Sequence, residues 1–215
     1  MVSSNPTEGT KYERHYMIEA DDVIVIDDII PKEDQIILFD LMSQNTLPYQ
    51  YYRSTVHDAA ALTKNNRIVD SSMMVNMVVI NDFVSPLLKE FVPIIAAIPF
   101  KIRHLLRVKV NITHPHLLSR EDTFNVPHVD YAGALNDGYD TLVTAIYYLN
   151  DSDGDTYIFD QDRKYNGHDL TIKKQVAPKQ GRLVVFSGNL LHSGNNPRRN
   201  ETRMVANINV VIVKE

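Results

Sequence analysis

One short stretch of the chain, together with a later histidine, decides the fold and the chemistry that we expect. The stretch is Asn125-Val126-Pro127-His128-Val129-Asp130, and some sixty residues later the chain continues with Leu191-His192-Ser193-Gly194. His128 and Asp130 are two residues apart, so both side chains leave the same face of an extended strand. One metal ion could therefore be bound by both.

His192 would supply a second imidazole if the fold brings it alongside this pair. Two nitrogens and one carboxylate oxygen on one side of an ion leave the opposite side free for small ligands, an open arrangement that suits oxygen chemistry at non-haem iron(II). In a chain with 8 histidines the His-x-Asp pair alone is a weak signal. Both elements, however, precede glycine-containing turns (Gly133 and Gly194), where sheets often gather ligands.

Composition narrows the class of protein. The chain has 215 residues, of which 44% are hydrophobic and 23% charged, and we expect one globular domain over residues 1–215. A formal charge of -5 argues against general nucleic-acid or anionic-membrane binding. Cysteine is absent, so histidine and carboxylate remain as metal ligands. Because the sequence contains neither a signal-peptide pattern nor an apolar run of membrane-spanning length, we expect a soluble cytoplasmic protein.

The N-terminal part of the chain is predicted to be mixed. Residues 22–27 indicate a short buried strand, and a helix is expected from Pro31 to about Ser43. Residues 73–80 fit either a strand or a helix. A second helix is expected from Asp82, with Pro93 ending or kinking it. We interpret about residues 1–100 as helical support with flanking strands.

After Pro99 the pattern changes to short strands separated by turn-forming residues, and we expect about residues 101–215 to form the core of the fold. This spacing predicts an antiparallel sandwich or barrel rather than alternating β-α units. The expected strands are residues 105–113, 124–130, 141–150, 156–160, 170–176, 182–187 and 202–213. The long connections 114–123 and 131–140 are candidate substrate loops, with ordinary surface loops as the alternative.

Arg203, the second residue of the last expected strand, is the next candidate. An arginine buried in an apolar strand requires an anionic partner, which a ligand carboxylate could supply in a bidentate pairing. An internal salt bridge to Asp or Glu is the alternative. If Arg203 points inward, so do Val205, Asn207 and Asn209. The alternate residues would form an apolar back that packs on helices: Met204, Ala206, Ile208 and Val210. Asn209 is then expected either to support the site or to face the substrate, with a buried structural hydrogen bond as the rival interpretation.

The same alternation applies to the strand over residues 141–150. It groups Thr144, Ile146 and Tyr148 on one face. A tyrosine hydroxyl on that face can donate a hydrogen bond to a carboxylate that Arg203 already holds.

These residues together resemble the Fe(II)- and 2-oxoglutarate-dependent dioxygenases of the prolyl hydroxylase type. The resemblance covers roughly Leu105 to Val213 and rests on His128-x-Asp130, Val143-Thr144-Ala145-Ile146-Tyr147-Tyr148-Leu149-Asn150, Asp153-Gly154-Asp155-Thr156, Gly181-Arg182-Leu183-Val184-Val185-Phe186, His192 and Thr202-Arg203. It implies a mainly β fold with supporting N-terminal helices, built on a double-stranded β-helix, or jelly roll.

The resemblance also implies roles for single residues. His128, Asp130 and His192 would bind iron, Arg203 would hold the distal carboxylate of 2-oxoglutarate, Tyr148 would donate to that carboxylate, and Thr144 would lie near the cosubstrate. The chain departs from the family in three places. The interval from His192 to Arg203 is longer than in several members, Asn111 stands where some relatives have tyrosine, and Asp153-Gly154-Asp155 replaces a paired glycine.

The function implied by the resemblance is an Fe(II)/2-oxoglutarate-dependent hydroxylase. It would act on an unactivated C–H bond, in a prolyl or other protein residue or in a small molecule, consuming dioxygen and 2-oxoglutarate, with ascorbate as a stimulant. The alternatives are a non-catalytic jelly-roll binding or structural protein, in which the histidines are incidental, and a metal-dependent cupin of another chemistry, which Arg203 disfavours.

Overall fold

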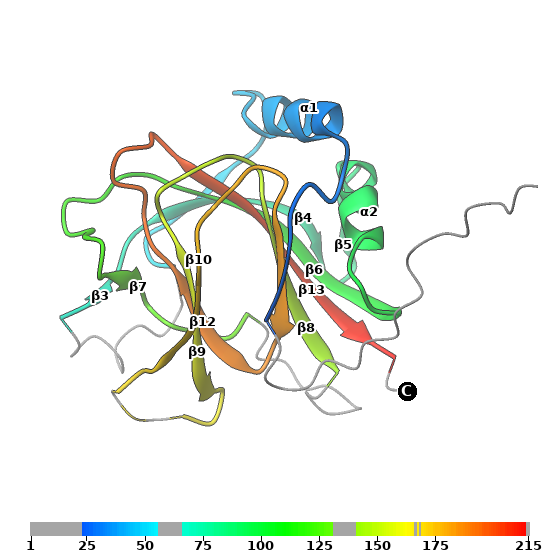
Figure 1. Ribbon diagram of the computed structural model, residues 1–215. Coiled ribbons are helices and arrows are strands. Elements are labelled where there is room, and N and C mark those ends of the chain that lie inside the picture. Colours follow the sequence, from blue (N-terminus) through cyan, green and yellow to red (C-terminus); the bar gives the residue numbers. More distant parts are fainter. Residues whose placement is uncertain (1–22, 56–65, 131–140, 166, 168, 214–215) are drawn as a thin grey trace, which may run out of the picture.

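A computed structural model describes residues 23–55, 66–130, 141–165, 167 and 169–213 (Figure 1). As the sequence predicts, strands dominate. The large sheet follows the order β1-β11-β8-β13-β6-β4-β2, with β5 paired to β4. Its strands are β1 (Val23–Ile26), β2 (Gln50–Tyr52), β4 (Met73–Ile80), β5 (Phe83–Val84), β6 (Ile102–Thr113), β8 (Leu142–Tyr148), β11 (Leu183–Ser187) and β13 (Arg203–Ile212).

A smaller sheet faces the large one, and its strands run in the order β10-β9-β12. They are β9 (Thr156–Asp162), β10 (Ile172–Val176) and β12 (Leu190–Gly194). A short parallel pair joins β3 (Ile68–Val69) to β7 (Phe124–Asn125). Apart from this pair, every strand pairing in the described residues is antiparallel.

Two helices, α1 (Lys32–Met42) and α2 (Leu88–Ala96), cover the other face of the large sheet (Figure 1). Leu38, Met42, Phe91 and Ile94 are buried there against the sheet, in what we call the helix-side core. Burying such apolar side chains is the main stabilising contribution available to a chain without disulfides. Neither described helix has the length and apolar character of a membrane span.

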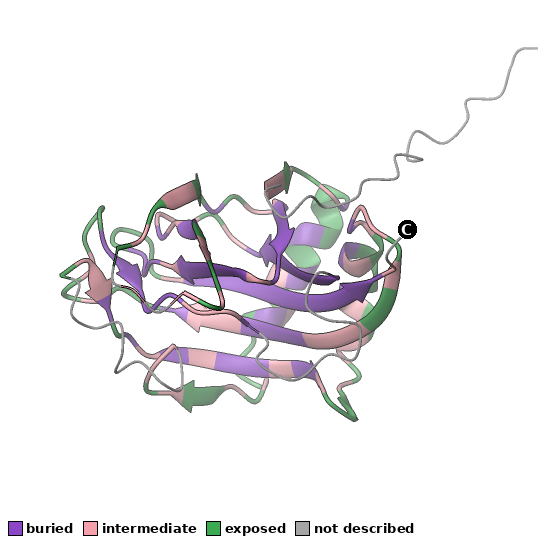
Figure 2. Cartoon of the chain, turned by 90° about the horizontal axis from the view of Figure 1, so that it is seen from below, coloured by how far each residue is buried: buried purple, intermediate pink, exposed green. Residues whose placement is uncertain are grey.

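The alternation of side chains along β13 explains why this strand contributes to the apolar clusters on both faces of the large sheet. Met204, Ala206, Ile208 and Val210 lie in the helix-side core. Val205, pointing the other way, belongs to a separate cluster between the two sheets. The sequence predicted this division, which follows from the two-residue period of a strand. Strands exposed on neither face are expected to be almost wholly buried, as Figure 2 shows for the middle of the large sheet.

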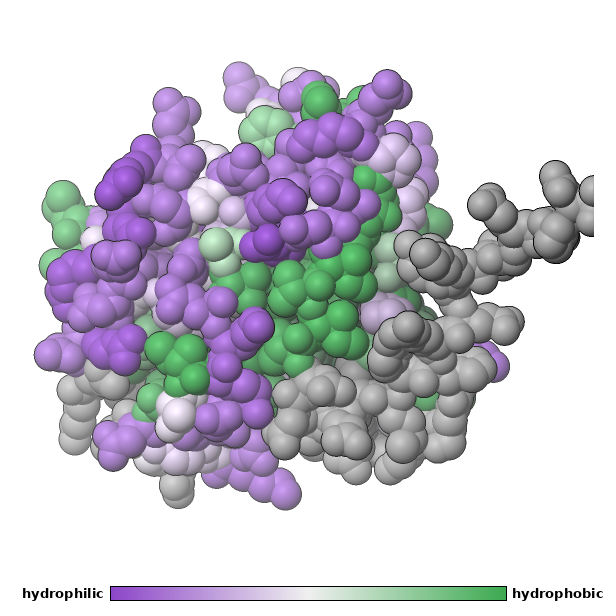
Figure 3. All heavy atoms as spheres, in the orientation of Figure 1, coloured by the Kyte–Doolittle hydropathy of each residue, from purple (hydrophilic) through white to green (hydrophobic). Residues whose placement is uncertain are grey.

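The cluster between the sheets fills the interior of the sandwich. Ile158, Val176 and Leu190 of the smaller sheet meet Tyr148, Phe186 and other large-sheet residues there. On the face seen in Figure 1, apolar side chains gather near the middle and polar ones surround them (Figure 3). One edge of the large sheet is β1, in which Val25 is exposed.

Several boundaries differ from the sequence-based expectation. The segment 73–80 is strand β4, because it pairs with β6 along most of its length. The expected helix from Asp82 begins only at Leu88, after β5. Pro93 lies inside α2 without ending it at once, and the helix stops one turn later at Ala96. Within the expected strand 124–130, only β7 and an isolated bridge at His128 are paired.

Candidate metal centre

The two histidines are brought together by backbone pairing. His128, beyond the end of β7, forms an isolated antiparallel bridge with His192 in β12. The His128 amide donates to the His192 carbonyl at 3.0 Å, and the His192 amide donates to the His128 carbonyl at 2.9 Å. The ring centroids are 4.9 Å apart. Residues that are directly opposite on paired strands project to the same face, so both imidazoles point inward.

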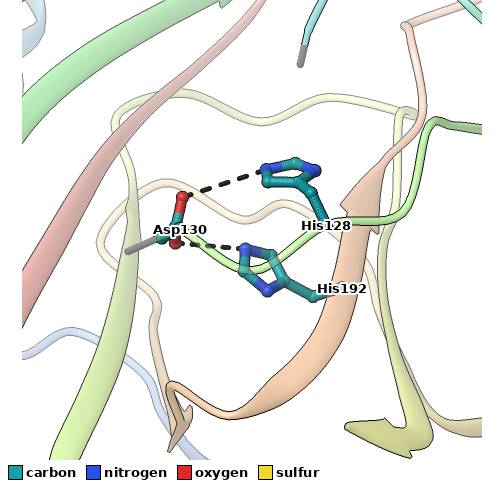
Figure 4. Close-up of side chains that lie close together, drawn as sticks. All are labelled: His128, Asp130 and His192. Carbon is teal, nitrogen blue, oxygen red and sulfur yellow. Dashed lines mark ion pairs between the residues drawn. The ribbon is translucent and has the colours of Figure 1, made fainter. Parts of the chain in front are cut away.

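Asp130 completes the cluster (Figure 4). Its Oδ2 lies 3.1 Å from His192 Nε2, and its Oδ1 lies 3.9 Å from His128 Nε2. One ligand atom from each of the three residues falls within 4.8 Å of the others. Two imidazoles and one carboxylate at this separation match the donor set of an open iron(II) site.

The hydrogen bonds of the histidines leave their Nε2 atoms free for a metal. His128 Nδ1 lies 2.9 Å from the Val126 carbonyl, and His192 Nδ1 lies 3.3 Å from the Leu190 carbonyl. A carbonyl can only accept, so each Nδ1 must carry the proton. In a neutral ring Nε2 then presents its lone pair, which is how a backbone carbonyl fixes the tautomer of a metal-binding histidine.

A cation fits this arrangement. His192 Nε2 is buried and has no hydrogen-bond partner, yet it faces an oxygen of Asp130 at 3.1 Å. A neutral imidazole and an ionised carboxylate would there direct two lone pairs at each other. A positive charge between them, either a proton or a metal ion, removes this conflict. The side chains present are therefore suited to the ion that the sequence predicts.

Asp130 is held by donors from three strands of the large sheet. Its Oδ2 accepts hydrogen bonds from Asn207 Nδ2 at 2.8 Å, Asn209 Nδ2 at 3.3 Å and Thr144 Oγ1 at 3.4 Å. Its Oδ1 accepts one from Arg107 Nη2 at 2.8 Å. Such contacts fix the orientation of a metal-binding carboxylate before the ion arrives.

Burial and neighbouring charges set the protonation states. Burial would raise the pKa of Asp130, but His192, Arg107 and Lys109 together hold that pKa well below its usual value. Burial and then His192 lower the pKa of His128 to about 3. Burial and then Arg107 lower the pKa of Lys109 to about 8. At neutral pH the centre thus combines an ionised carboxylate with a neutral His128 ring.

Arg203 lies at the other end of the inward face of β13 and is buried. Its Nε donates to the Gly154 carbonyl at 2.7 Å, and its Nη2 donates to Thr156 Oγ1 at 2.7 Å. Among the described residues no Asp or Glu forms a salt bridge with it. A Cβ on Gly194 would lie 3.1 Å from the guanidinium carbon, so glycine leaves room beside the charge. We call Arg203, Tyr148 and Thr156 the deep end of the site.

Tyr148 shares a partner with Arg203. Its hydroxyl donates to Thr156 Oγ1 at 2.7 Å, and the guanidinium carbon of Arg203 lies 5.7 Å from the ring centroid of Tyr148. Burial raises the pKa of Tyr148, so its hydroxyl stays a donor. The structure therefore brings together Arg203 and Tyr148, as expected, and adds Thr156, which the sequence did not single out for the site.

The remaining candidates fall in different places. Thr144 contacts Asp130 at the metal centre. The fully buried Asn209 contacts Asp130, Thr144 and Arg107, and its role as a substrate contact stays a prediction. Asn111 Oδ1 is buried without a partner. The candidate loop 131–140 lies outside the described residues.

Arg107 and Lys109 are functional candidates that the sequence reasoning missed. Both lie on β6, and their alternation with Val108 and Val110 was the available signal. An Arg-x-Lys pair in a strand otherwise faced with valine indicates that one face is polar.

Comparison with known proteins gives a consistent result. A sequence model described as the 2OG-Fe(II) oxygenase superfamily matches residues 115–211. No curated protein matches the chain.

Solved structures share the fold at low sequence identity. A prolyl hydroxylase from Trichoplax adhaerens, in complex with a hypoxia-inducible factor peptide fragment, is 14% identical with a TM-score of 0.55, over 89% of this chain and 84% of that chain. An oxidoreductase of the 2OG-Fe(II) oxygenase family from Burkholderia pseudomallei is 15% identical with a TM-score of 0.58, over 87% and 85%. HygX from Streptomyces hygroscopicus, with nickel, 2-oxoglutarate and hygromycin B bound, is 13% identical with a TM-score of 0.57, over 90% and 84%. The predicted jelly roll is thereby confirmed.

Proposed function

We propose that this chain hydroxylates an unactivated C–H bond. It belongs through residues 115–211 to the 2OG-Fe(II) oxygenase superfamily and is a 2-oxoglutarate-dependent dioxygenase. The observation that carries the proposal is the convergence of His128, Asp130 and His192 on one point, with Asp130 ionised. In this reaction class, iron(II) with 2-oxoglutarate and dioxygen supplies the oxidising power, and succinate and carbon dioxide are the other products.

Each residue of the cluster has a separate task in this proposal. His128 and His192 would hold iron through Nε2, while the Val126 and Leu190 carbonyls keep the proton on Nδ1. Asp130 would contribute one oxygen to the metal, and Asn207, Asn209 and Thr144 support its carboxylate. Because these donors are already in place, little reorganisation is needed when the metal binds.

The deep end is proposed to orient the cosubstrate. Arg203 is a buried cation whose described hydrogen bonds all end on neutral acceptors. The distal carboxylate of 2-oxoglutarate would provide the missing negative charge. Tyr148 is proposed to turn its hydroxyl from Thr156 to that carboxylate, and Thr144 to lie beside the cosubstrate chain. Holding both ends of a flexible keto acid fixes its reacting end at the metal and excludes water from it.

The substrate is proposed to be a protein residue, such as prolyl, or a small molecule. The prolyl hydroxylase complexed with a peptide shares the fold, as does the HygX structure with hygromycin B bound, so the fold accommodates both kinds of ligand. We further propose that about residues 1–100 support a catalytic core formed by about residues 101–215 within one domain.

The direct test follows succinate formation with iron(II), 2-oxoglutarate and ascorbate, with and without candidate substrates. We expect His128→Ala and His192→Ala to bring succinate formation to background, and His104→Ala, a change of an exposed histidine on β6, to leave it unaltered. Full turnover in both site variants would exclude the proposed iron ligands. A non-catalytic jelly-roll protein would instead show no metal uptake and no thermal stabilisation by N-oxalylglycine, a keto-acid mimic.

A further inference from the structure

Strand β6 directs two cationic side chains toward the metal centre. Arg107 pairs across the sheet with Asn209, and Lys109 pairs with Asn207. Both asparagines donate to Asp130. Since residues opposite each other on paired strands share a face, Arg107 and Lys109 lie on the same inward face as the carboxylate. We call these two residues the cationic pair.

Lys109 has fewer hydrogen-bond acceptors and acidic partners than a buried ammonium group requires. It is only 8% exposed, and its Nζ lies 3.9 Å from Asp130 Oδ1, which is beyond hydrogen-bonding distance. No other acidic side chain in the described ranges pairs with it. A nearly buried ammonium group that forms no hydrogen bond with the described residues is unfavourable, so a further acceptor is expected at this position.

Arg107 does not relieve this shortage, because it uses the same carboxylate. Its Nη2 donates to Asp130 Oδ1 at 2.8 Å, and its Nε donates to Asn209 Oδ1 at 3.0 Å. Two cations, the buried Lys109 and the partly buried Arg107, therefore share one anion, and that anion is the proposed ligand of a doubly charged metal.

A charge count, which rests on the proposed function, shows what the loaded site lacks. The two positive charges of iron(II) would be balanced by Asp130 and by one of the two carboxylates of 2-oxoglutarate. Arg203 balances the other carboxylate of the cosubstrate. The cationic pair then has two positive charges with no counterpart among the described residues.

We propose that the cationic pair is a carboxylate subsite for the primary substrate, which is an acid carrying its carboxylate near the C–H bond that reacts. The pair is reachable from solvent, because the side chains of Arg107 and Lys109 are 17% and 11% exposed. An uncharged internal prolyl residue would leave both cations uncompensated. The subsite therefore favours free acids, or acidic residues of a protein, as the substrate class.

The test measures thermal unfolding of the full-length protein loaded with Mn(II) and N-oxalylglycine, which occupy the metal centre and the deep end. Formate, acetate and N-acetyl-L-proline are compared, at constant ionic strength, with formamide, acetamide and N-acetyl-L-prolinamide, their neutral counterparts. We expect the acids at tens of millimolar to raise the unfolding midpoint, and the amides to have no effect.

Variants identify where the acids bind. Lys109→Met should abolish the stabilisation by acids, and Lys109→Arg should retain part of it. Lys101→Met removes the same charge from an exposed position just before β6 and should behave as the unchanged protein. Calorimetric titration of the acids and of N-oxalylglycine into each Mn(II)-loaded variant provides the second readout. We expect Lys109→Met to lower the affinity for the acids at least tenfold more than it lowers the affinity for N-oxalylglycine.

Three results would overturn the subsite: no stabilisation of the unchanged protein by any acid, equal effects of acids and amides, or equal stabilisation of Lys109→Met. If Lys109→Met weakens only N-oxalylglycine, the pair serves the cosubstrate, and the proposal is likewise wrong. Failure of the proposed function gives a different pattern, because the unchanged protein would then bind neither Mn(II) nor N-oxalylglycine. The acid and amide comparison on the metal-free protein would in that case still decide whether the pair binds carboxylates.

Discussion

The metal centre and the deep end lie on the same inward face of β13, but they treat buried charge in opposite ways. At the metal centre, Asp130 is an anion surrounded by donors, among them Arg107 at 2.8 Å. At the deep end, Arg203 is a cation whose described hydrogen bonds go to neutral oxygens, those of Gly154 and Thr156. The first region carries its own counter-charge, whereas the second is suited to receive one from a ligand.

Substitutions in the two regions are therefore expected to have different consequences. Removing one partner from a compensated buried pair leaves a bare charge and destabilises the fold, whereas replacing a buried ion that has no ionic partner leaves no bare charge behind. Substitutions at the metal centre should lower the stability of the fold, whereas substitutions at the deep end should mainly lower ligand affinity.

The largest expected effect comes from Asp130→Ala. It removes the carboxylate that Arg107 and Lys109 share, so the metal-free protein should lose about 3–5 kcal/mol of unfolding free energy. Urea unfolding measures this loss, and calorimetry should show that Mn(II) binding is gone. If the variant unfolded like the unchanged protein, Asp130 would not be the counter-charge that stabilises the metal centre.

Arg203→Met should have the reverse profile. We expect the affinity for N-oxalylglycine to fall about 10- to 100-fold, because charged hydrogen bonds to a ligand carboxylate are lost. The unfolding free energy should fall by less than in Asp130→Ala, because the hydrogen bonds that are lost end on neutral oxygens and no described carboxylate loses its partner. Titration of the Mn(II)-loaded protein measures the affinity, with Arg199→Met, in the exposed turn before β13, as the matched control. A stability loss as large as that of Asp130→Ala would contradict the contrast.

Acidification should lower the stability of the metal-free protein through the protonation of His128. Its pKa is about 3 in the folded protein and about 6.5 when unfolded, so between these values the unfolded chain binds more protons. The stability of the metal-free protein should thus fall as pH is lowered from about 6.5 toward 3, by less than the one-proton limit of about 1.4 kcal/mol per pH unit, since the ring is partly exposed. Urea unfolding at a series of pH values measures the slope, which His128→Gln should reduce.

The smallest expected effect is that of Asn207→Ala. Its amide donates to Asp130 Oδ2 at 2.8 Å, and losing such an orienting contact should weaken Mn(II) binding about 10-fold. Asn76→Ala is the matched control, because that buried asparagine of β4 donates to the Pro48 carbonyl instead. Equal Mn(II) dissociation constants for the two variants would show that Asp130 is oriented without Asn207.

Sequence patterns predicted most of the elements that surround the site. Alternation alone assigned Asn207 and Asn209 to one face of β13 and Met204 to the other, because a strand has a two-residue period. Periodicity failed where pairing decides the element: residues 73–80 form β4 because β6 lies beside them. The helix start at Leu88 was missed for a similar reason, since β5 first pairs with β4.

Residue identity and local backbone geometry are enough to specify the ligand types, the spacing of His128 and Asp130, and the polar face of β13. Strand packing brings His192 opposite His128, places Thr156 between Arg203 and Tyr148, and brings Arg107 and Lys109 to Asp130. These contacts join residues far apart in the chain. Their register is set by the packing of whole strands, which no local pattern encodes.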